Sequence, residues 1–300
     1  MNEQLSGQEH EAPIEQQENR QSRIVLHFLR HGAKEQAQEG QSDETVQLTP
    51  EGRRQASDKS TLEDISQSVA FGSPRERAQQ TAGLAMAGKQ EGITGEETLP
   101  ELKEKLDQEL KLGSKLGVDA RLNFTTDKKT EFGQMTDQAV KDGTLLKLIV
   151  GESDEWAKKP GNEGNIFYSE NAAKVASIIE KYIGISPRWD QLVQQEPKYK
   201  ETLERFMGTH QTVGESFLAK VIELTKGIEE RGRFVAALDS SGFGFTEGFD
   251  VEIVHTDGQP EINVKYKKER DGKIIYELNE IIPADTLTEI IKQGQELTKK

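Results

Sequence analysis

Two short apolar segments, each followed by the start of a helix, constrain the fold of this chain most. Residues 24–29 read Ile-Val-Leu-His-Phe-Leu, and this apolar run predicts a buried strand. Residues 68–72 predict a second strand of the same kind. Thr-Pro at 49–50 and Ser-Pro at 73–74 each place a capping side chain before a proline, which predicts two helix starts. The order strand, helix, strand, helix favours an α/β sheet.

The rest of the chain divides into a tail, a less regular middle and a regular C-terminal third. Residues 1–22 carry almost no large apolar side chain and predict a disordered tail before a domain over 23–300. Residues 105–210 are interpreted as a mostly helical insertion. Beyond it, the pattern predicts a helix from 212 and strands over 234–238, 251–254, 262–266 and 274–278, then a terminal helix over 283–297.

Composition excludes several classes of protein. The 300 residues contain no cysteine, which excludes disulfides, thiol catalysis and sulfur-ligated zinc. The formal net charge of −14 argues against a general affinity for nucleic acid or an anionic membrane. No apolar stretch is long enough to span a membrane, and no secretory signal is visible, so we expect a cytoplasmic protein. The oligomeric state does not follow from the sequence.

The side chains that suggest chemistry follow the two predicted strands. Arg30, His31 and Gly32 come directly after the first strand, and Arg77 lies in the first turn of the helix after the second. In open α/β sheets, ligands bind beyond the carboxyl ends of the strands. Two arginines and an imidazole at such an edge, beside free N–H groups of a helix start, suit a phosphoryl group.

Three segments resemble the histidine phosphatase superfamily, also called the phosphoglycerate mutase-like family. They are Arg-His-Gly at 30–32, Leu-Thr-Pro-Glu-Gly-Arg-Arg-Gln-Ala at 48–56 and Ser-Pro-x-x-Arg-Ala-x-x-Thr-Ala at 73–82, in the family's order. The clear resemblance covers residues 23 to about 102 and returns more loosely over 212–245. It implies a three-layer α/β/α sandwich with a mixed, mainly parallel sheet, to which the helical insertion is added.

The resemblance also implies a phosphatase that acts on a phosphorylated small molecule without a metal or other cofactor. His31 would attack phosphorus and carry a phosphohistidine, while Arg30 and Arg77 hold the phosphoryl oxygens. Glu101, with Glu104 as its competitor, would protonate the leaving oxygen. Gly32 is expected to contribute to substrate binding. The longer signature of the mutases is absent from residues 33–48, so hydrolysis is favoured over mutation.

One expected catalytic group, a second histidine after a late strand, is missing from the place where the family has it. Aligned after the predicted strand 234–238, Ser240 takes that position and is expected to bind substrate; a one-residue slip would put Asp239 there. His210 and His255 lie in polar segments and are expected to be exposed, although either could fold back to replace it. The alternative function is therefore a catalytically impaired pseudophosphatase that binds a phosphate ligand or a protein.

Overall fold

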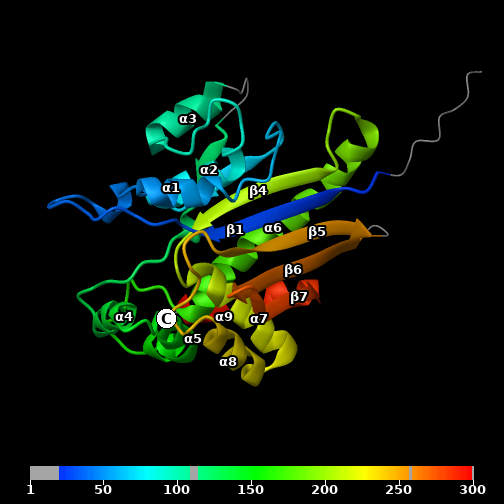
Figure 1. The fold of residues 1–300 in the computed structure, drawn as a ribbon. Helices are drawn as coiled ribbons and strands as arrows, with labels where there is room; N and C mark the ends of the chain where they lie inside the picture. Colours follow the sequence, from blue (N-terminus) through cyan, green and yellow to red (C-terminus); the bar gives the residue numbers. More distant parts are fainter. Residues whose placement is uncertain (1–19, 109–113, 257–258, 299–300) are drawn as a thin grey trace, which may run out of the picture.

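The computed structural model describes residues 20–108, 114–256 and 259–298, and its centre is one mixed β-sheet (Figure 1). Within these residues the sheet has seven strands in the order β3-β2-β4-β1-β5-β6-β7. Strands β3, β2, β4 and β1 pair in parallel, and β5, β6 and β7 continue the sheet by antiparallel pairing. The strands are β1 (Arg23–Arg30), β2 (Val69–Gly72), β3 (Leu116–Val118), β4 (Thr202–Thr209), β5 (Gly248–Thr256), β6 (Gln259–Arg270) and β7 (Lys273–Ile282).

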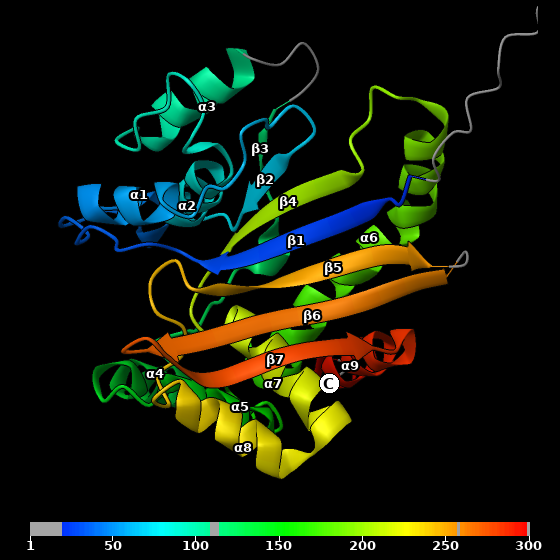
Figure 2. The ribbon, with the colours of Figure 1, turned by 45° about the vertical axis from the view of Figure 1, so that its right-hand side comes forward.

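Helices cover the two faces of the sheet and build separate cores, which confirms the predicted α/β class with a mixed sheet. Helix α2 packs on β2 and β4, with α1 and α3 beside it, while α6 and α7 lie on the other face and α9 packs against α6 (Figure 2). Helices α4 and α5 lie toward the carboxyl end of β1. The helices are α1 (Pro50–Ser57), α2 (Glu76–Ala87), α3 (Leu99–Gln108), α4 (Glu131–Lys141), α5 (Leu145–Trp156), α6 (Tyr168–Gln195), α7 (Val213–Lys226), α8 (Ile228–Ala237) and α9 (Ala284–Thr298), with short 3-10 turns η1 (Asp43–Thr45) and η2 (Ala120–Leu122).

The helix start predicted at Thr49 is confirmed, but the one predicted at Ser73 is not. Helix α2 begins at Glu76, with Arg75 at the cap position and no side-chain cap, and the hydroxyl of Ser73 accepts from the N–H of Arg75 at 3.2 Å. The hydroxyl of Thr49 accepts a hydrogen bond from the N–H of Gly52 at 3.0 Å, and Pro50 is the first residue of α1. This arrangement satisfies an N–H group that has no partner within the helix. The strands predicted over 24–29 and 68–72 are present as β1 and β2.

One prediction about the later chain is wrong. Residues 234–238 do not form a strand, because they complete α8 and the turn after it, with Phe234, Val235 and Leu238 buried at helical spacing. The range 105–210, predicted as a mostly helical insertion, holds the helices α4, α5 and α6, and it also takes in β3 and β4. Strand β4 lies between β1 and β2, near the middle of the sheet. The last part of the expected insertion is therefore sheet core.

Most of the predicted tail, residues 1–19, lies outside the described residues. Arg20 and Ser22, which the prediction included in that tail, contact the folded part: Arg20 donates to the carbonyl of Val193 at 2.8 Å, and Ser22 donates to Asp190 at 2.7 Å. Among the helices that the structure describes, none combines the length and the apolar composition needed to cross a bilayer.

Candidate active site

Three parallel strands end side by side, and the residue after each one belongs to the candidate site. The register pairs Arg30 of β1 with Thr209 of β4, so the next residues, His31 and His210, leave the sheet at the same edge. The N–H of His31 donates to the carbonyl of Thr209 at 3.0 Å. Strand β2 ends beside them, because the N–H of Ser73 donates to the carbonyl of Gly208 at 3.1 Å. The two histidine rings lie 5.2 Å apart, edge to face.

His31 is held with one defined nitrogen available for reaction. Its Nδ1 lies 2.7 Å from the carbonyl oxygen of Gly32. A carbonyl can only accept a hydrogen bond, so Nδ1 carries the proton and Nε2 keeps its lone pair. The residue is 7% exposed, and burial, with the nearby charges of Arg77, Arg30 and Lys34, lowers its pKa to about 3. The imidazole is therefore neutral at physiological pH, as a nucleophile requires.

His210 is the second histidine of the site, and the expectation that it is exposed was wrong. It is 4% exposed, and its Nε2 lies 2.7 Å from the hydroxyl of Ser73. That hydroxyl already accepts from the N–H of Arg75 at 3.2 Å, so its own proton is free to bond to Nε2. When the hydroxyl donates to Nε2, Nδ1 of His210 carries the proton. This Nδ1 is buried without a hydrogen-bond partner among the described residues. Burial lowers the pKa of His210 well below its usual value.

Arg30 ends β1 and contacts the loop before β5. Its guanidinium donates to the carbonyl of Phe243 and lies 4.9 Å from the centre of the Phe245 ring. That ring is also 6.4 Å from the imidazole of His31 and is largely exposed. The Nε of Arg30 is buried without a partner. Arg30 thus lies at the site as predicted, with one buried donor that nothing in the described chain satisfies.

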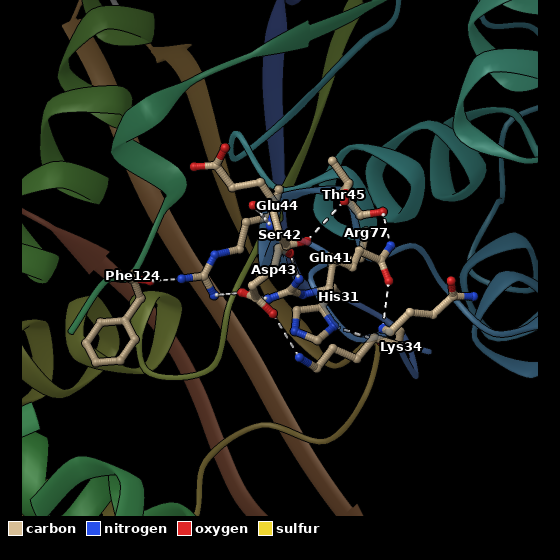
Figure 3. Close-up of polar contacts among 12 residues, drawn as sticks. His31, Lys34, Gln41, Ser42, Asp43, Glu44, Thr45, Arg77 and Phe124 are labelled. Carbon is tan, nitrogen blue, oxygen red and sulfur yellow. Dashed lines mark hydrogen bonds and ion pairs between the residues drawn. The ribbon is translucent and has the colours of Figure 1, made fainter. Parts of the chain in front are cut away.

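Arg77 is almost fully buried at the start of α2, and its guanidinium holds Asp43 of η1. One terminal nitrogen donates to the Asp43 carbonyl at 2.6 Å, and the other to its carboxylate at 2.8 Å. Lys34 and Arg75 contact the same carboxylate at 3.0 and 3.2 Å (Figure 3). These cations hold the pKa of Asp43 well below its usual range, against the opposing effect of burial. Three positive side chains therefore converge on one carboxylate.

Gly32 has a steric role at the site. A Cβ atom at this position would lie 2.6 Å from the carbonyl oxygen of Gly52 in α1, which is closer than side chains tolerate. The N–H of Gly32 donates to the hydroxyl of Thr81 in α2 at 3.1 Å, while its carbonyl orients His31. The lack of a side chain at Gly32 lets this loop pass between α1 and α2, where the Gly32 carbonyl holds the imidazole of His31.

Two predicted site residues lie in other surroundings. The carboxylate of Glu101 is exposed and accepts two bonds from Thr98, one from its N–H at 2.8 Å and one from its hydroxyl at 2.7 Å. These are the bonds of a helix cap at the start of α3, and they lower the pKa of Glu101. Ser240 does not follow a strand, which corrects its expected place at the site. It lines a surface pocket between α5 and α8.

Asp239 and His255 could also have taken the place of the second histidine. His255 lies near the end of β5, which runs antiparallel to β1, so it is at the opposite edge of the sheet from His31. There its Nε2 lies 2.8 Å from the hydroxyl of Ser186. The carboxylate of Asp239 forms an exposed ion pair with Arg270. His255 therefore does not contribute to the site, and the carboxylate of Asp239 is engaged by Arg270.

Sequence reasoning missed three residues of the site: Lys34, Asp43 and Arg75. It named His210 only as a residue that could fold back to replace the second histidine, although His210 follows the apolar pair at 206–207 and comes two residues before the helix start at 212. Ser240 was preferred because 234–238 is the more apolar run. Asp43 and Lys34 lie in a polar loop with no local motif. Within the described residues, no group of three or more histidine and acidic side chains is arranged to hold a metal ion.

The assembled side chains can bind a tetrahedral dianion beside a neutral imidazole. Buried nitrogen atoms of Arg30, Arg77 and His210 have no hydrogen-bond partner among the described residues. Arg30 precedes His31 in the chain, His210 follows the strand residue paired with Arg30, and Arg77 lies within electrostatic reach of His31. Such donors stabilise the charge that builds up on a phosphoryl group during transfer. The arrangement thus suits in-line attack by nitrogen on phosphorus.

Comparison with known proteins agrees with this chemistry over the first part of the chain. Residues 26–110 match the model of the histidine phosphatase superfamily (branch 1), which confirms the predicted resemblance for that segment. No curated protein sequence matches the chain.

Several solved structures resemble the chain at low identity. Mycobacterial glucosyl-3-phosphoglycerate phosphatase is 18% identical, with a TM-score of 0.44, over 80% of this chain and 93% of that one. Phosphoglycerate mutase from Bacillus anthracis is 15% identical, with a TM-score of 0.43, over 92% and 99%. A phosphoserine phosphatase mutant from Entamoeba histolytica is 16% identical, with a TM-score of 0.36, over 80% and 94%.

Proposed function

Because residues 26–110 carry the histidine phosphatase signature, we propose that this protein hydrolyses a phosphomonoester of a small molecule through a phosphohistidine on His31. The observation that carries the proposal is the pair of buried histidines at the neighbouring ends of β1 and β4. Arg30 and Arg77 supply the positive charge that a phosphoryl dianion needs.

The proposed reaction has two steps: His31 is phosphorylated in the first and regenerated in the second. The lone pair of Nε2 attacks phosphorus, an N–P bond forms, and the P–O bond to the leaving group breaks with its electron pair on oxygen. That oxygen takes up a proton. In the second step the oxygen of water attacks phosphorus and gives one proton to the group that protonated the leaving oxygen, the N–P bond breaks, and its electron pair returns to Nε2. Inorganic phosphate is the second product.

His210 and the arginines have complementary roles in this proposal. The protonated Nδ1 of His210 donates to a phosphoryl oxygen, and Arg30 and Arg77 hold the others. A dianion bound beside His210 raises the pKa of that imidazole, which favours its charged form as a donor when substrate binds. Its contribution grows as negative charge moves toward the departing oxygen.

The donor of the proton to the leaving group comes from the resemblance alone. The resemblance names Glu101, but the bonds from Thr98 make its carboxylate a stable cap and lower its pKa. A general acid works best with a pKa near the working pH. Glu101 therefore remains a prediction from the resemblance, and its test is a substrate whose leaving group requires protonation.

The alternative, an impaired pseudophosphatase, loses its main argument. It rested on the absence of a histidine after residues 234–238, which form a helix rather than a strand. The strand that precedes a histidine is β4, and the residue that follows is His210. Two buried histidines with arginines near both of them favour catalysis over binding alone.

Trapping of the phosphoenzyme tests the proposal directly. The protein is mixed with p-nitrophenyl phosphate or a labelled phosphomonoester and quenched in base, since a phosphoramidate is stable in base and labile in acid. We expect a base-stable label that His31→Ala abolishes together with turnover. The Glu63→Gln variant, at an exposed position before β2, serves as a control that retains both. A label that survives His31→Ala would remove His31 from the proposed role.

A further inference from the structure

The positive side chains at the candidate site already hold an anion that belongs to the protein itself. Oδ1 of Asp43 lies 3.0 Å from Nζ of Lys34, and Oδ2 lies 2.8 Å from Arg77 and 3.2 Å from Arg75. A carboxylate surrounded by three cations has the environment that phosphate oxygens have in a binding site. Asp43 thus fills a cradle whose chemistry is that of an oxyanion site.

Asp43 occupies both terminal nitrogens of Arg77. One of them donates to the backbone carbonyl of Asp43 and the other to its carboxylate. Each terminal nitrogen keeps a second N–H, and Nε is buried without a hydrogen-bond partner among the described residues. The fork of an arginine binds oxyanions through two parallel hydrogen bonds. The pair of terminal N–H groups that holds Asp43 becomes available to a substrate only when Asp43 leaves.

The cradle lies within electrostatic reach of both histidines. The charges of Arg77 and Lys34 lower the pKa of His31, and Arg75, Arg77 and Lys34 lower that of His210. An anion in the cradle is therefore within electrostatic reach of His31. The Asp43 side chain is 47% exposed, so it can swing into solvent without breaking a packed core.

We propose that Lys34, Arg75 and Arg77 form an oxyanion cradle for the phosphoryl group, and that Asp43 is its internal occupant until substrate displaces it. This inference rests on the proposed function and adds to it two binding residues, Lys34 and Arg75, and a self-occupied resting state. The apparent affinity for phosphate is reduced by the fraction of molecules in which the cradle is open. Displacement of Asp43 is then a step in binding.

The test compares the binding of inorganic phosphate by wild type, Asp43→Ala and Glu44→Ala, measured by calorimetry at constant ionic strength. If the open state is about a tenth of the wild-type population, Asp43→Ala tightens binding about tenfold. Glu44→Ala removes the same charge one residue away from an exposed side chain, so it separates displacement from a general electrostatic effect. Equal or weaker binding by Asp43→Ala, or an equal gain in Glu44→Ala, would overturn the proposal.

A second measurement uses the unmodified protein, in case Asp43→Ala does not fold. Saturating phosphate should speed hydrogen exchange of the backbone amides in 42–46, because this segment loses its bonds to Arg77. Slower or unchanged exchange there would contradict displacement.

The two proposals fail in different ways. Tighter phosphate binding by Asp43→Ala without any phosphoenzyme in wild type would support the cradle and refute catalysis. Turnover and a phosphoenzyme on His31, with no gain in Asp43→Ala, would support catalysis and refute the internal occupant. If neither protein binds phosphate, the cradle assignment is wrong.

Discussion

Replacing His31 with glutamine should flatten the pH dependence of stability between pH 7 and pH 5. The folded protein buries a neutral imidazole whose pKa is lowered to about 3, first by burial and then by neighbouring cations. In the unfolded chain the same imidazole titrates with a pKa of about 6.5. Between these values the unfolded chain binds the extra proton, so stability is lost as pH falls below about 6.5.

The magnitude follows from the two pKa values. The unfolded chain has bound about a quarter of a proton at this side chain at pH 7 and nearly a full proton at pH 5. Integration over this range gives a loss of about 2 kcal/mol in wild type that His31→Gln does not show. Buried Glu215, whose pKa burial raises, has the opposite dependence, but its contribution is common to both proteins and cancels in the comparison.

Urea unfolding at pH 7, 6 and 5, followed by circular dichroism, measures the effect. Asp43 does not interfere, because its lowered pKa restricts its contribution to lower pH. His210→Gln should change the profile in the same direction, since burial lowers that pKa too. If wild type and His31→Gln lost the same stability between pH 7 and pH 5, His31 would not be a buried neutral imidazole, and its assignment as a ready nucleophile would fail.

Three further substitutions test the remaining site assignments. His210→Ala should lower kcat/KM for p-nitrophenyl phosphate by roughly 10²- to 10³-fold, the usual effect of removing one donor to a developing oxyanion. Ser240→His should bring no gain, because Ser240 faces the pocket between α5 and α8; a gain in kcat/KM would instead place residue 240 beside the phosphoryl group. Glu101→Ala should lower the midpoint of urea unfolding slightly through loss of the cap and leave turnover of p-nitrophenyl phosphate unchanged. A selective loss with an alkyl phosphate, whose leaving group needs a proton, would make Glu101 the general acid.

Local patterns in the sequence predicted the first half of the site. A strand that ends in Arg30 and His31, and a Ser-Pro helix start that carries Arg77, are each defined by residues close together in the chain. Capping bonds and strand propensity act over a few residues, so they can be read without the fold. The α/β class follows from the same local information, whereas the steric role of Gly32 depends on its contact with Gly52 of α1.

The second half of the site depended on contacts between distant segments. Strand β4 contains Glu204 and Arg205 and is less apolar than residues 234–238, so composition favoured the wrong segment. Pairing with β1 and β2 makes β4 a central strand, since it buries Leu203, Phe206 and Met207. Short apolar runs do not distinguish strand from helix by periodicity alone, and tertiary pairing decides.

The sequence by itself determined the proposed nucleophile, the arginines near it and the kind of sheet that presents them, because those features are encoded in short motifs. Only the tertiary structure decided that His210 stands beside His31 and that Asp43 fills the cradle of Lys34, Arg75 and Arg77. The parallel register joins residues that are far apart in the chain, as it does Arg30 and Thr209. No local preference specifies such a pairing; the burial of a shared sheet core does.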